Sequence, residues 1–277
     1  MAICPQYAAL IIVLKLWVMP VAAKGAFMGS VFGIIIAAGI VEDYGIHRAM
    51  LSDLPAPRRV YCADGGLRHM EPLGLAPDLI LGDLDSADPS LINRFQNNGA
   101  QFERYPAEKD YTDTELAVER AAGDGCDTLL IFGALGARID HTFTNIQLIF
   151  KYISRGIRIA IADCYGMASV LVPGCSLRIY KRRPLASLLK LLPEAESASA
   201  LALAPVFANP KLSILPIGGI VRGVRTSGLK YALCGADLEA CYTVGVSNEF
   251  MGAAAMVEIE DGAVLIMICA DKQAPPR

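Results

Sequence analysis

Two aspartates separated by one residue, Asp83 and Asp85, directly follow the apolar run Leu79-Ile80-Leu81. A turn that begins at Gly82 can bring both carboxylates onto one hard cation. Carboxylate oxygens and water are the ligands that Mg²⁺ prefers, usually beside substrate phosphates. Taken alone, the pair is more typical of a solvated loop with a helix cap. It indicates a metal site only if other polar segments reach the same place.

A second polar turn, Ala63-Asp64-Gly65-Gly66, follows the apolar run Val60-Tyr61-Cys62. Gly65 and Gly66 allow the backbone to approach a ligand closely, and Asp64 can bond to a sugar hydroxyl or to a metal-bound water. Open parallel sheets bind their ligands at the carboxyl ends of the strands, where both turns are expected. The two turns together therefore favour a small-molecule site.

A third turn follows the apolar residues 129–132 and contains Gly133, Gly136, Arg138, Asp140 and His141. A glycine-bearing loop that leads into a helix offers free N–H groups to anionic oxygens. The planar guanidinium of Arg138 suits phosphate, and Asp140 can orient it or bind a ribose or a base edge. For this loop alone, a surface salt bridge is an equally good interpretation. His141 starts a helix, where a histidine more often caps, so we give it a binding role at most.

The fourth polar segment is Lys109-Asp110-Tyr111-Thr112-Asp113-Thr114-Glu115-Leu116. Thr112 or Asp113 is typical of a helix N-cap, and Glu115 stands three residues after Thr112 as in a capping box. Aspartates at this helix end can also help to hold a cation, while Lys109 can neutralise phosphate charge. Capping and metal binding do not exclude each other.

The elements that must position these turns follow from the apolar pattern. Between residue 31 and about residue 163, short β-branched runs alternate with helix-like stretches, which predicts a parallel sheet covered by helices on both faces. Helices are expected at residues 88–99 and 112–122 because of their caps. The expected strands are residues 33–37, 59–63, 79–81, 128–132 and 158–162.

After about residue 163 the pattern changes to short strand-like runs separated by turn residues, which predicts a smaller antiparallel β domain. The expected strands include residues 169–172, 177–180 and 255–259. Asp261-Gly262 lies between two such runs and predicts a hairpin. Residues 181–210 fit neither pattern and are interpreted as an insertion.

Composition limits the classes of function. A chain of 277 residues with 54% hydrophobic content is long enough for two domains with their own cores. The net charge of −3 and the pI near 5.7 disfavour nucleic-acid binding. The chain has eight cysteines, none in a C-x-x-C pair, and only three histidines. This argues against a zinc site and against a disulfide framework. Such cysteines are typical of a reducing compartment, so we expect a cytoplasmic protein.

The first 27 residues contain an almost wholly apolar run at residues 8–23, interrupted by Lys15 and Pro20. The run resembles a signal-peptide core, but no positive charge precedes it, and it is shorter than the roughly 20 residues that span a bilayer. A buried-strand pattern begins soon after Met28. We therefore expect a dispensable leader or a natural start at Met28, and no stable membrane association.

In this order, the four polar segments resemble those of the thiamine pyrophosphokinase family. Ser227-Gly228-Leu229-Lys230-Tyr231 and Gly245-Val246-Ser247-Asn248-Glu249-Phe250 look like the thiamine-binding half of that family. Each motif is modest alone, but several in register are specific. The resemblance spans about residues 31–268. Three features depart from the family pattern: Leu84 replaces a common aromatic residue, Ala137 replaces a frequent glycine, and the insertion is unusual.

The resemblance implies a fold and an assembly. The fold is α/β, with an ATP-binding parallel-sheet domain at residues 28–163, helices on both its faces, and an antiparallel β-sandwich domain at residues 164–272. The insertion at about residues 181–210 belongs to the sandwich domain. The implied assembly is a homodimer, in which thiamine lies between the nucleotide domain of one chain and the sandwich of the other.

The resemblance also implies a reaction, the transfer of pyrophosphate from ATP to the hydroxyl of thiamine with Mg²⁺ as cofactor. The metal ligands would be Asp83, Asp85 and Asp113, which with Arg138 form the catalytic set. The nucleotide-binding residues would be Asp64, Gly65, Gly66, Lys109, Thr112, Gly133, Gly136, Arg138, Asp140 and His141. Thiamine would contact Tyr231, Ser247 and Asn248. Without the resemblance, Ser247-Asn248 is typical of an ordinary turn and Tyr231 of a core aromatic.

Two other functions remain open at this point. A nucleotidyl or glycosyl transferase also uses two aspartates and a divalent metal, and its products keep the nucleoside phosphate or the sugar. A non-catalytic nucleotide or thiamine sensor is the alternative from another class, although the complete set of carboxylates with Lys109 argues against it.

Overall fold

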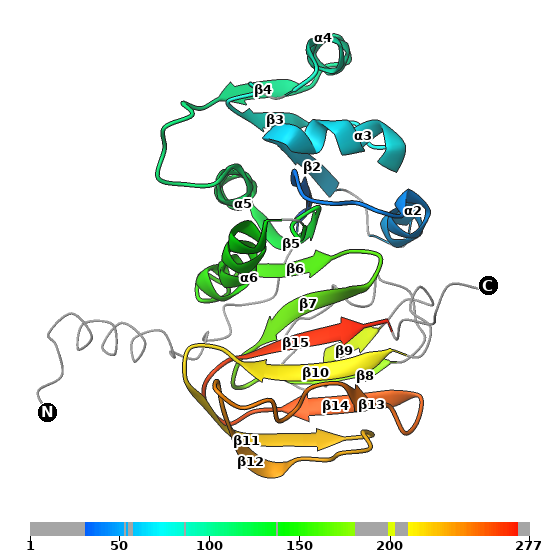
Figure 1. Cartoon of the computed structure of the whole chain (residues 1–277), viewed down its shortest axis with the longest axis vertical. Helices are drawn as coiled ribbons and strands as arrows, with labels where there is room; N and C mark the ends of the chain where they lie inside the picture. The colour runs from blue at the N-terminus through cyan, green and yellow to red at the C-terminus, as the bar shows by residue number, and fades with distance from the viewer. Residues whose placement is uncertain are drawn as a thin grey trace, which may run out of the picture.

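The computed structural model describes residues 31–52, 54, 58–85, 87–136, 138–180, 199–202 and 210–270 (Figure 1). The expected leader lies outside the described residues, as does the expected insertion apart from residues 199–202 and 210. In the part of the chain that is described, no helix is long and apolar enough to cross a membrane.

Six neighbouring strands form the parallel part of a ten-stranded sheet, in the order β4-β3-β2-β1-β5-β6. They are β1 (Val31–Ile36), β2 (Arg58–Ala63), β3 (Leu79–Gly82), β4 (Gln101–Arg104), β5 (Cys126–Phe132) and β6 (Arg158–Ala162). Five of the six were predicted. The sixth, β4, is an edge strand without fully buried residues, and its sequence lacks an apolar run.

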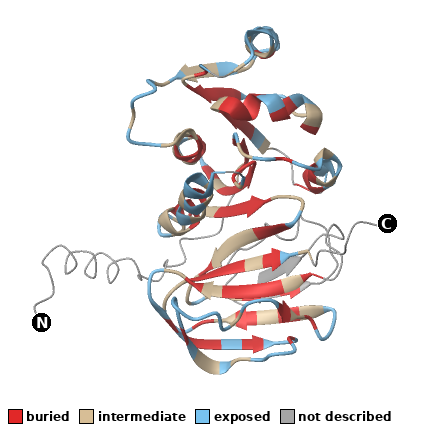
Figure 2. Cartoon of the chain, in the orientation of Figure 1, coloured by how far each residue is buried: buried red, intermediate tan, exposed pale blue. Residues whose placement is uncertain are grey.

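Helices cover both faces of this sheet, as predicted. The helices α2 (Tyr44–Ser52), α3 (Leu67–Leu73) and α4 (Pro89–Asn97) pack on one core, and α5 (Asp113–Gly123) and α6 (Ile139–Ile153) pack on the other. Ile34 and Ile36 belong to the first core and Ile35 to the second, because alternate side chains of a strand point to opposite faces. This explains the uninterrupted apolar run of β1. Figure 2 shows buried residues along the strands and exposed residues on the outer sides of the helices.

The two predicted helix starts are confirmed. Asp88 Oδ1 accepts a hydrogen bond from the Ser90 N–H at 2.8 Å, and Thr112 Oγ1 accepts one from the Glu115 N–H at 3.2 Å. The Glu115 carboxylate bonds to Lys151 on α6. One half of the expected capping box is therefore present, and Glu115 also joins α5 to α6.

The sheet continues beyond β6 in antiparallel fashion through β7 (Gly166–Leu171), β15 (Val264–Cys269), β10 (Lys211–Pro216) and β13 (Asn248–Glu249). A second, five-stranded sheet has the order β12-β11-β14-β8-β9. Its strands are β8 (Ser176–Tyr180), β9 (Ser199–Ala202), β11 (Ile220–Ser227), β12 (Cys234–Glu239) and β14 (Ala254–Glu258). The predicted antiparallel region is thus confirmed, and the strands expected at 169–172, 177–180 and 255–259 are β7, β8 and β14.

One core fills the space under α2 to α4 and the space between the two sheets, where Ile214 and Val257 are buried. Parallel and antiparallel strands share one sheet across residue 163, which the composition change did not indicate. The boundaries of the two domains stay a prediction.

The hairpin predicted at Asp261-Gly262 is wrong. The strand before it, β14, pairs with β8 and β11, whereas the strand after it, β15, pairs with β7 and β10 in the other sheet. Gly262 has a φ of 93°, as a tight turn requires. The dipeptide therefore identifies the turn correctly, but the chain crosses from one sheet to the other there.

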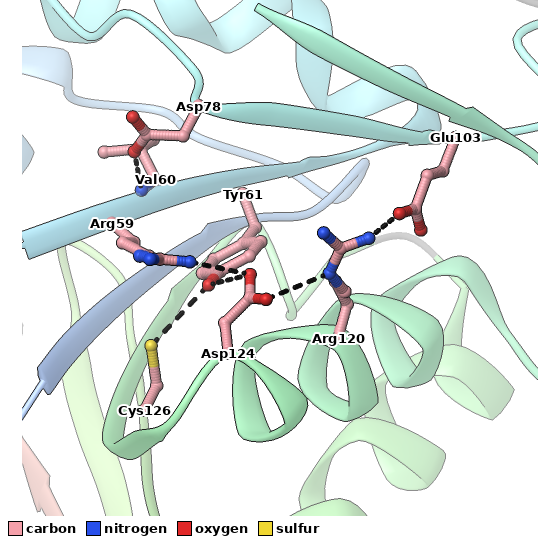
Figure 3. Close-up of polar contacts among 8 residues, drawn as sticks. All are labelled: Arg59, Val60, Tyr61, Asp78, Glu103, Arg120, Asp124 and Cys126. Carbon is pink, nitrogen blue, oxygen red and sulfur yellow. Dashed lines mark hydrogen bonds and ion pairs between the residues drawn. The ribbon is translucent and has the colours of Figure 1, made fainter.

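A polar cluster joins α5 to the sheet at the end of the helix (Figure 3). The carboxylate of Asp124 accepts the Tyr61 hydroxyl at 2.9 Å, and pairs with Arg59 at 3.1 Å and with Arg120 at 3.2 Å. Burial raises the pKa of Asp124, but the hydrogen bonds from Tyr61 and Arg120 outweigh it, so the net pKa is lowered. Burial also raises the pKa of Tyr61, which keeps its hydroxyl a donor.

We expect Asp124→Asn to lower the free energy of unfolding at pH 7 by about 1 to 3 kcal/mol, because it weakens three charge-assisted bonds. The lowered pKa means that this stabilisation is present above the unfolded-state pKa of about 3.9 and is lost as the pH falls through the folded-state pKa. Urea unfolding of both proteins at pH 7 and near pH 3 measures the effect. The exposed Glu108→Gln is the control, and equal stability of Asp124→Asn and wild type at pH 7 would contradict the prediction.

Candidate functional site

The strand order reverses between β1 and β5. From β1 the chain moves outward through β2, β3 and β4, and then returns to the other side of β1 at β5. The loops after β1 and β5 lead to α2 and α6, which pack on opposite faces of the sheet. Open sheets bind ligands at such a reversal, beside the carboxyl ends of the strands.

The loops after β1 and β5 contact each other through their backbones. The Gly39 N–H donates to the Gly133 carbonyl at 2.6 Å, and the Ile40 N–H donates to the Leu135 carbonyl at 2.9 Å. A Cβ on Gly39 would lie 2.3 Å from both carbonyl oxygens, so only glycine fits. The loop after β1 was not among the predicted site segments, since Ala38-Gly39-Ile40 carries no charged or polar side chain.

The loop after β5 is fixed from the side of α6 as well. The buried Asn145 donates to the Ala134 carbonyl at 2.7 Å, and Thr142 Oγ1 accepts the Gly136 N–H at 3.2 Å. Gly133 has a φ of 65°, and a Cβ there would lie 2.4 Å from the Ala37 carbonyl oxygen. The backbone of this loop is therefore held on two sides.

The turn after β2 begins as a 3₁₀ turn, Asp64–Gly66, and lies against the end of β1. A Cβ on Gly66 would be 2.2 Å from the Ile36 carbonyl oxygen, and Gly65 is also buried. Asp64 has a φ of 39°, and its Oδ1 accepts the Leu84 N–H at 3.1 Å. Asp64 thus connects the turn after β2 to the turn after β3.

The turn after β3 carries the two aspartates. Asp83 is half-buried and accepts the Asp85 N–H at 3.2 Å, while Asp85 is exposed. Leu84 between them is buried and has a φ of 60°, which is uncommon for a residue with a Cβ. The buried leucine anchors this unusual backbone and leaves both carboxylates on the solvent side. Ser86 lies outside the described residues.

Lys109 and Asp113 form an ion pair at 3.0 Å, with only 14% and 29% of their side chains exposed. The Lys109 ammonium also donates to the Pro106 carbonyl at 3.1 Å. Within the described residues, the buried Asp113 Oδ1 has no partner of good hydrogen-bond geometry. The contact between Lys109 and Asp113 is therefore a close ion pair, but its orientation is not optimal for a hydrogen bond.

The three predicted metal ligands are not gathered into one cluster. No group of three or more His, Cys, Asp or Glu side chains that could hold a metal ion exists among the residues the structure describes. Asp83 and Asp85 share one turn, and Asp113 lies at the start of α5.

Arg138 and Asp140 form a two-bond pair at the start of α6. Arg138 Nη2 donates to Asp140 Oδ2 at 2.7 Å, and Nε to Oδ1 at 3.3 Å. The guanidinium, followed by the His141 N–H, lowers the pKa of Asp140 to about 2. Both side chains are mostly exposed, at 70% and 61%, and His141 is exposed beside them. Arg138 occupies the N-cap position without a side-chain cap bond.

The three predicted thiamine residues lie together in the β-sandwich region. The buried Asn248 accepts the Tyr231 N–H at 3.0 Å and donates to the Tyr231 carbonyl at 2.7 Å. Tyr231 is 62% exposed. Ser247 is exposed, has a φ of 57°, and donates its N–H to Ser213 Oγ at 2.9 Å. Asn248 thus fixes the backbone of Tyr231. Because Tyr231 is mostly exposed, the interpretation of Tyr231 as a core aromatic does not hold.

The fold defines a class: a doubly wound, mostly parallel α/β sheet that continues into antiparallel strands and packs beside a second sheet, with polar turns after the parallel strands β2, β3 and β5. Two family models match the chain. The catalytic domain of thiamin pyrophosphokinase matches residues 55–161, and its vitamin B1 binding domain matches residues 202–264.

Known proteins agree with these matches. The thiamine pyrophosphokinase of Bacillus subtilis (strain 168) is 27% identical over 206 residues, covering 74% of this chain and 84% of the relative. Thiamine pyrophosphokinase 3 of Oryza sativa subsp. japonica is 26% identical over 196 residues, covering 69% and 64%. With the two models spanning more than half of its length, the chain belongs to the thiamine pyrophosphokinase family.

Solved structures show the same fold. A crystal structure of thiamine pyrophosphokinase from Bacillus subtilis has a TM-score of 0.70 at 21% identity and covers 88% of this chain and 100% of its own. Thiamin pyrophosphokinase from Candida albicans has a TM-score of 0.65 at 18% identity, with coverages of 87% and 90%.

We expect Arg138→Ala to raise the pKa of Asp140 from about 2 toward the ordinary value of about 3.9, because the substitution removes the largest cause of the shift. Carboxyl ¹³C NMR titration measures the pKa, with the resonance assigned through Asp140→Asn. Asp88, whose pKa is lowered by its bonds to Ser90, is the internal control and should not change. An Asp140 pKa that stays near 2 in Arg138→Ala would refute the pairing.

Proposed function

We propose that this chain catalyses the pyrophosphoryl transfer of its family, from ATP to the hydroxyl of thiamine, at the carboxyl edge of the parallel strands. The supporting observation is that the loops after β1, β2, β3 and β5 are linked by hydrogen bonds or close backbone contact at the strand-order reversal. All but the loop after β1 lie inside the match to the catalytic domain. Tyr231, Ser247 and Asn248 lie inside the match to the vitamin B1 binding domain.

The chain's own groups suit the phosphates of ATP. Arg138 presents a planar guanidinium that Asp140 holds in place, at the positive end of the 15-residue α6. Lys109 brings a partly buried positive charge. The close-packed glycines Gly133 and Gly136 allow backbone approach, and Asp64, Gly65, Gly66, Thr112 and His141 complete the proposed nucleotide site.

Mg²⁺ would be held by Asp83, Asp85 and Asp113. These oxygen donors fit the ion in type, and Mg²⁺ is commonly bound by one or two carboxylates together with substrate phosphates and water, so a preformed cluster of three is not required. Bound there, the ion would neutralise phosphate charge. Asp113 is included in this metal site because its buried Oδ1 lacks a well-oriented hydrogen-bond partner. Leaving a buried carboxylate oxygen in that state costs free energy, which a bound cation would offset.

The reaction forms a bond between the thiamine hydroxyl oxygen and the β-phosphorus of ATP and breaks the bond from that phosphorus to the α,β-bridging oxygen. AMP leaves, and the hydroxyl proton passes to a carboxylate of the site. The protein's part is positioning and charge stabilisation, as in phosphoryl transfer generally. In this proposal, Arg138 and Lys109 stabilise the negative charge that spreads over the phosphates.

Thiamine would contact Tyr231, Ser247 and Asn248, and Asn248 also holds the backbone of Tyr231 in place. We propose that residues 28–163 and 164–272 act as nucleotide and thiamine domains, and that two chains pair so that thiamine lies between the nucleotide domain of one and the sandwich of its partner. We propose a cytoplasmic location for the enzyme.

We expect purified protein with ATP, Mg²⁺ and thiamine to release AMP and thiamine diphosphate in equal amounts, because one bond is broken for each bond formed. Chromatography with mass spectrometry measures both products, with controls lacking metal or thiamine. A product in which the nucleoside phosphate or a sugar is joined to the acceptor would point to a nucleotidyl or glycosyl transferase. ATP binding without either product would point to a sensor.

We expect Asp83→Asn and Asp113→Asn each to lower kcat/KM by on the order of 100-fold or more, because each removes charge aimed at the metal–phosphate complex. Asp88→Asn is a matched control in the segment after β3, since asparagine caps a helix as well as aspartate does and α4 should be preserved. Steady-state kinetics at fixed Mg²⁺ measure the effect. Full activity in Asp83→Asn would rule out its metal role.

A further inference from the structure

The loop after β1 lies between two neighbours. On one side it donates backbone N–H groups to the loop after β5, at the carbonyls of Gly133 and Leu135. On the other side it accepts side-chain bonds from α3, in which His69 Nε2 lies 2.9 Å from the Gly39 carbonyl oxygen. Arg68, the preceding residue, bonds to the Ala38 and Gly39 carbonyls.

The protonation of His69 follows from its partners. A carbonyl oxygen can only accept, so Nε2 must carry the proton that it donates to Gly39. The neutral ring then accepts at Nδ1, where the Tyr44 hydroxyl lies 2.8 Å away and donates. Burial, together with the charges of Arg68 and His47, lowers the pKa of His69 despite the raising effect of the Gly39 bond, which favours this neutral form.

The hydrogen bonds donated by Gly39 and Ile40 fix which way two peptide groups of the loop after β5 point. In a trans peptide the C=O and the next N–H point in opposite directions. The Gly133 and Leu135 carbonyls face the loop after β1, so the N–H groups of Ala134 and Gly136 point away from it. The Gly136 N–H is also held by Thr142 Oγ1 on α6. The Ala134 N–H is therefore the group whose orientation depends on the loop after β1 staying in place.

We propose that His69, oriented by Tyr44, is a positioning residue for nucleotide binding, which holds the loop after β1 and through it the Ala134 N–H of the loop after β5. His69 is 4% exposed and touches no proposed substrate group itself. This inference rests on the proposed function, because it assigns His69 to the nucleotide half of that site.

A purely structural histidine would stabilise the fold without affecting the affinity for ATP. To separate the two roles, we would compare His69→Leu, His69→Gln and Tyr44→Phe. Leucine removes the donor to Gly39, whereas glutamine can place its amide nitrogen close to the position of Nε2 and restore the donation. Arg48→Ala is the matched control, because Arg48 also joins α2 to α3, through the Pro72 carbonyl at 2.8 Å, without touching the loop.

The measurements are the Kd of ATP by calorimetry, KM for ATP and for thiamine, kcat, and urea unfolding. We expect His69→Leu to weaken ATP binding and raise KM for ATP about tenfold, the size of one lost buried hydrogen bond, with KM for thiamine unchanged. His69→Gln should recover to within about threefold of wild type. Tyr44→Phe should lie between the two, and Arg48→Ala should bind ATP as wild type does.

A folded His69→Leu that binds ATP like wild type would overturn the proposal, as would a loss of affinity in Arg48→Ala of the same size. If His69→Leu does not fold, Tyr44→Phe decides, and unchanged ATP affinity there refutes the role. A wild-type protein that binds no ATP contradicts the proposed function before any variant is compared. ATP binding without the expected products would contradict the proposed reaction. The ATP affinities of the variants would then still decide whether His69 is a positioning residue.

Discussion

The pairing of β1 with β5 is the constraint on which the site depends. Both strands are buried on both faces, and their alternate side chains belong to two different cores, so their register is fixed by apolar packing rather than by any polar group. Their pairing extends past the strands into the loops, through Ala37 to Phe132 and Gly39 to Gly133. Glycine is required where the two loops meet because a Cβ would clash with backbone carbonyls. The polar turn after β5 is thereby placed at the end of a strand that is buried on both faces.

The same sheet carries the second half of the protein. Because β7 pairs with β6 in antiparallel fashion, the antiparallel strands extend the parallel part of the same sheet, and one core is continuous from α2 to the space between the two sheets. Displacing the sandwich relative to the parallel strands would break backbone hydrogen bonds of the ladder. Within one chain, the proposed nucleotide and thiamine residues are therefore held by a common framework rather than by a flexible linker.

Much of this arrangement could be predicted from the sequence, and the failures have physical causes. Strands buried on both faces are long apolar runs, and helix caps such as Asp88 and Thr112 act locally, so both were found. The edge strand β4 has no apolar run because it buries little, and the hairpin at Asp261-Gly262 failed because a turn type does not specify which sheet the next strand joins. The loop after β1 was missed because its partners Gly133 and Leu135 lie far away in the chain. His69 was missed because its partner Gly39 is 30 residues away.

The candidate site contains two ion pairs that differ in exposure and in geometry. Arg138 and Asp140 neutralise each other in an exposed, geometrically good pair, which is worth little in stability because water screens it. Lys109 and Asp113 are more buried, and their contact is close but not well oriented. A partly buried ammonium and carboxylate whose mutual bond is imperfect lose less on separation than an ideal pair does, so they can take the proposed phosphate and metal partners at a smaller cost. The pair of Lys109 and Asp113 is thus the part of the candidate site best suited to rearrange around a ligand. The loops after β1 and β5 are held by backbone hydrogen bonds and close-packed glycines, and they can keep their conformation.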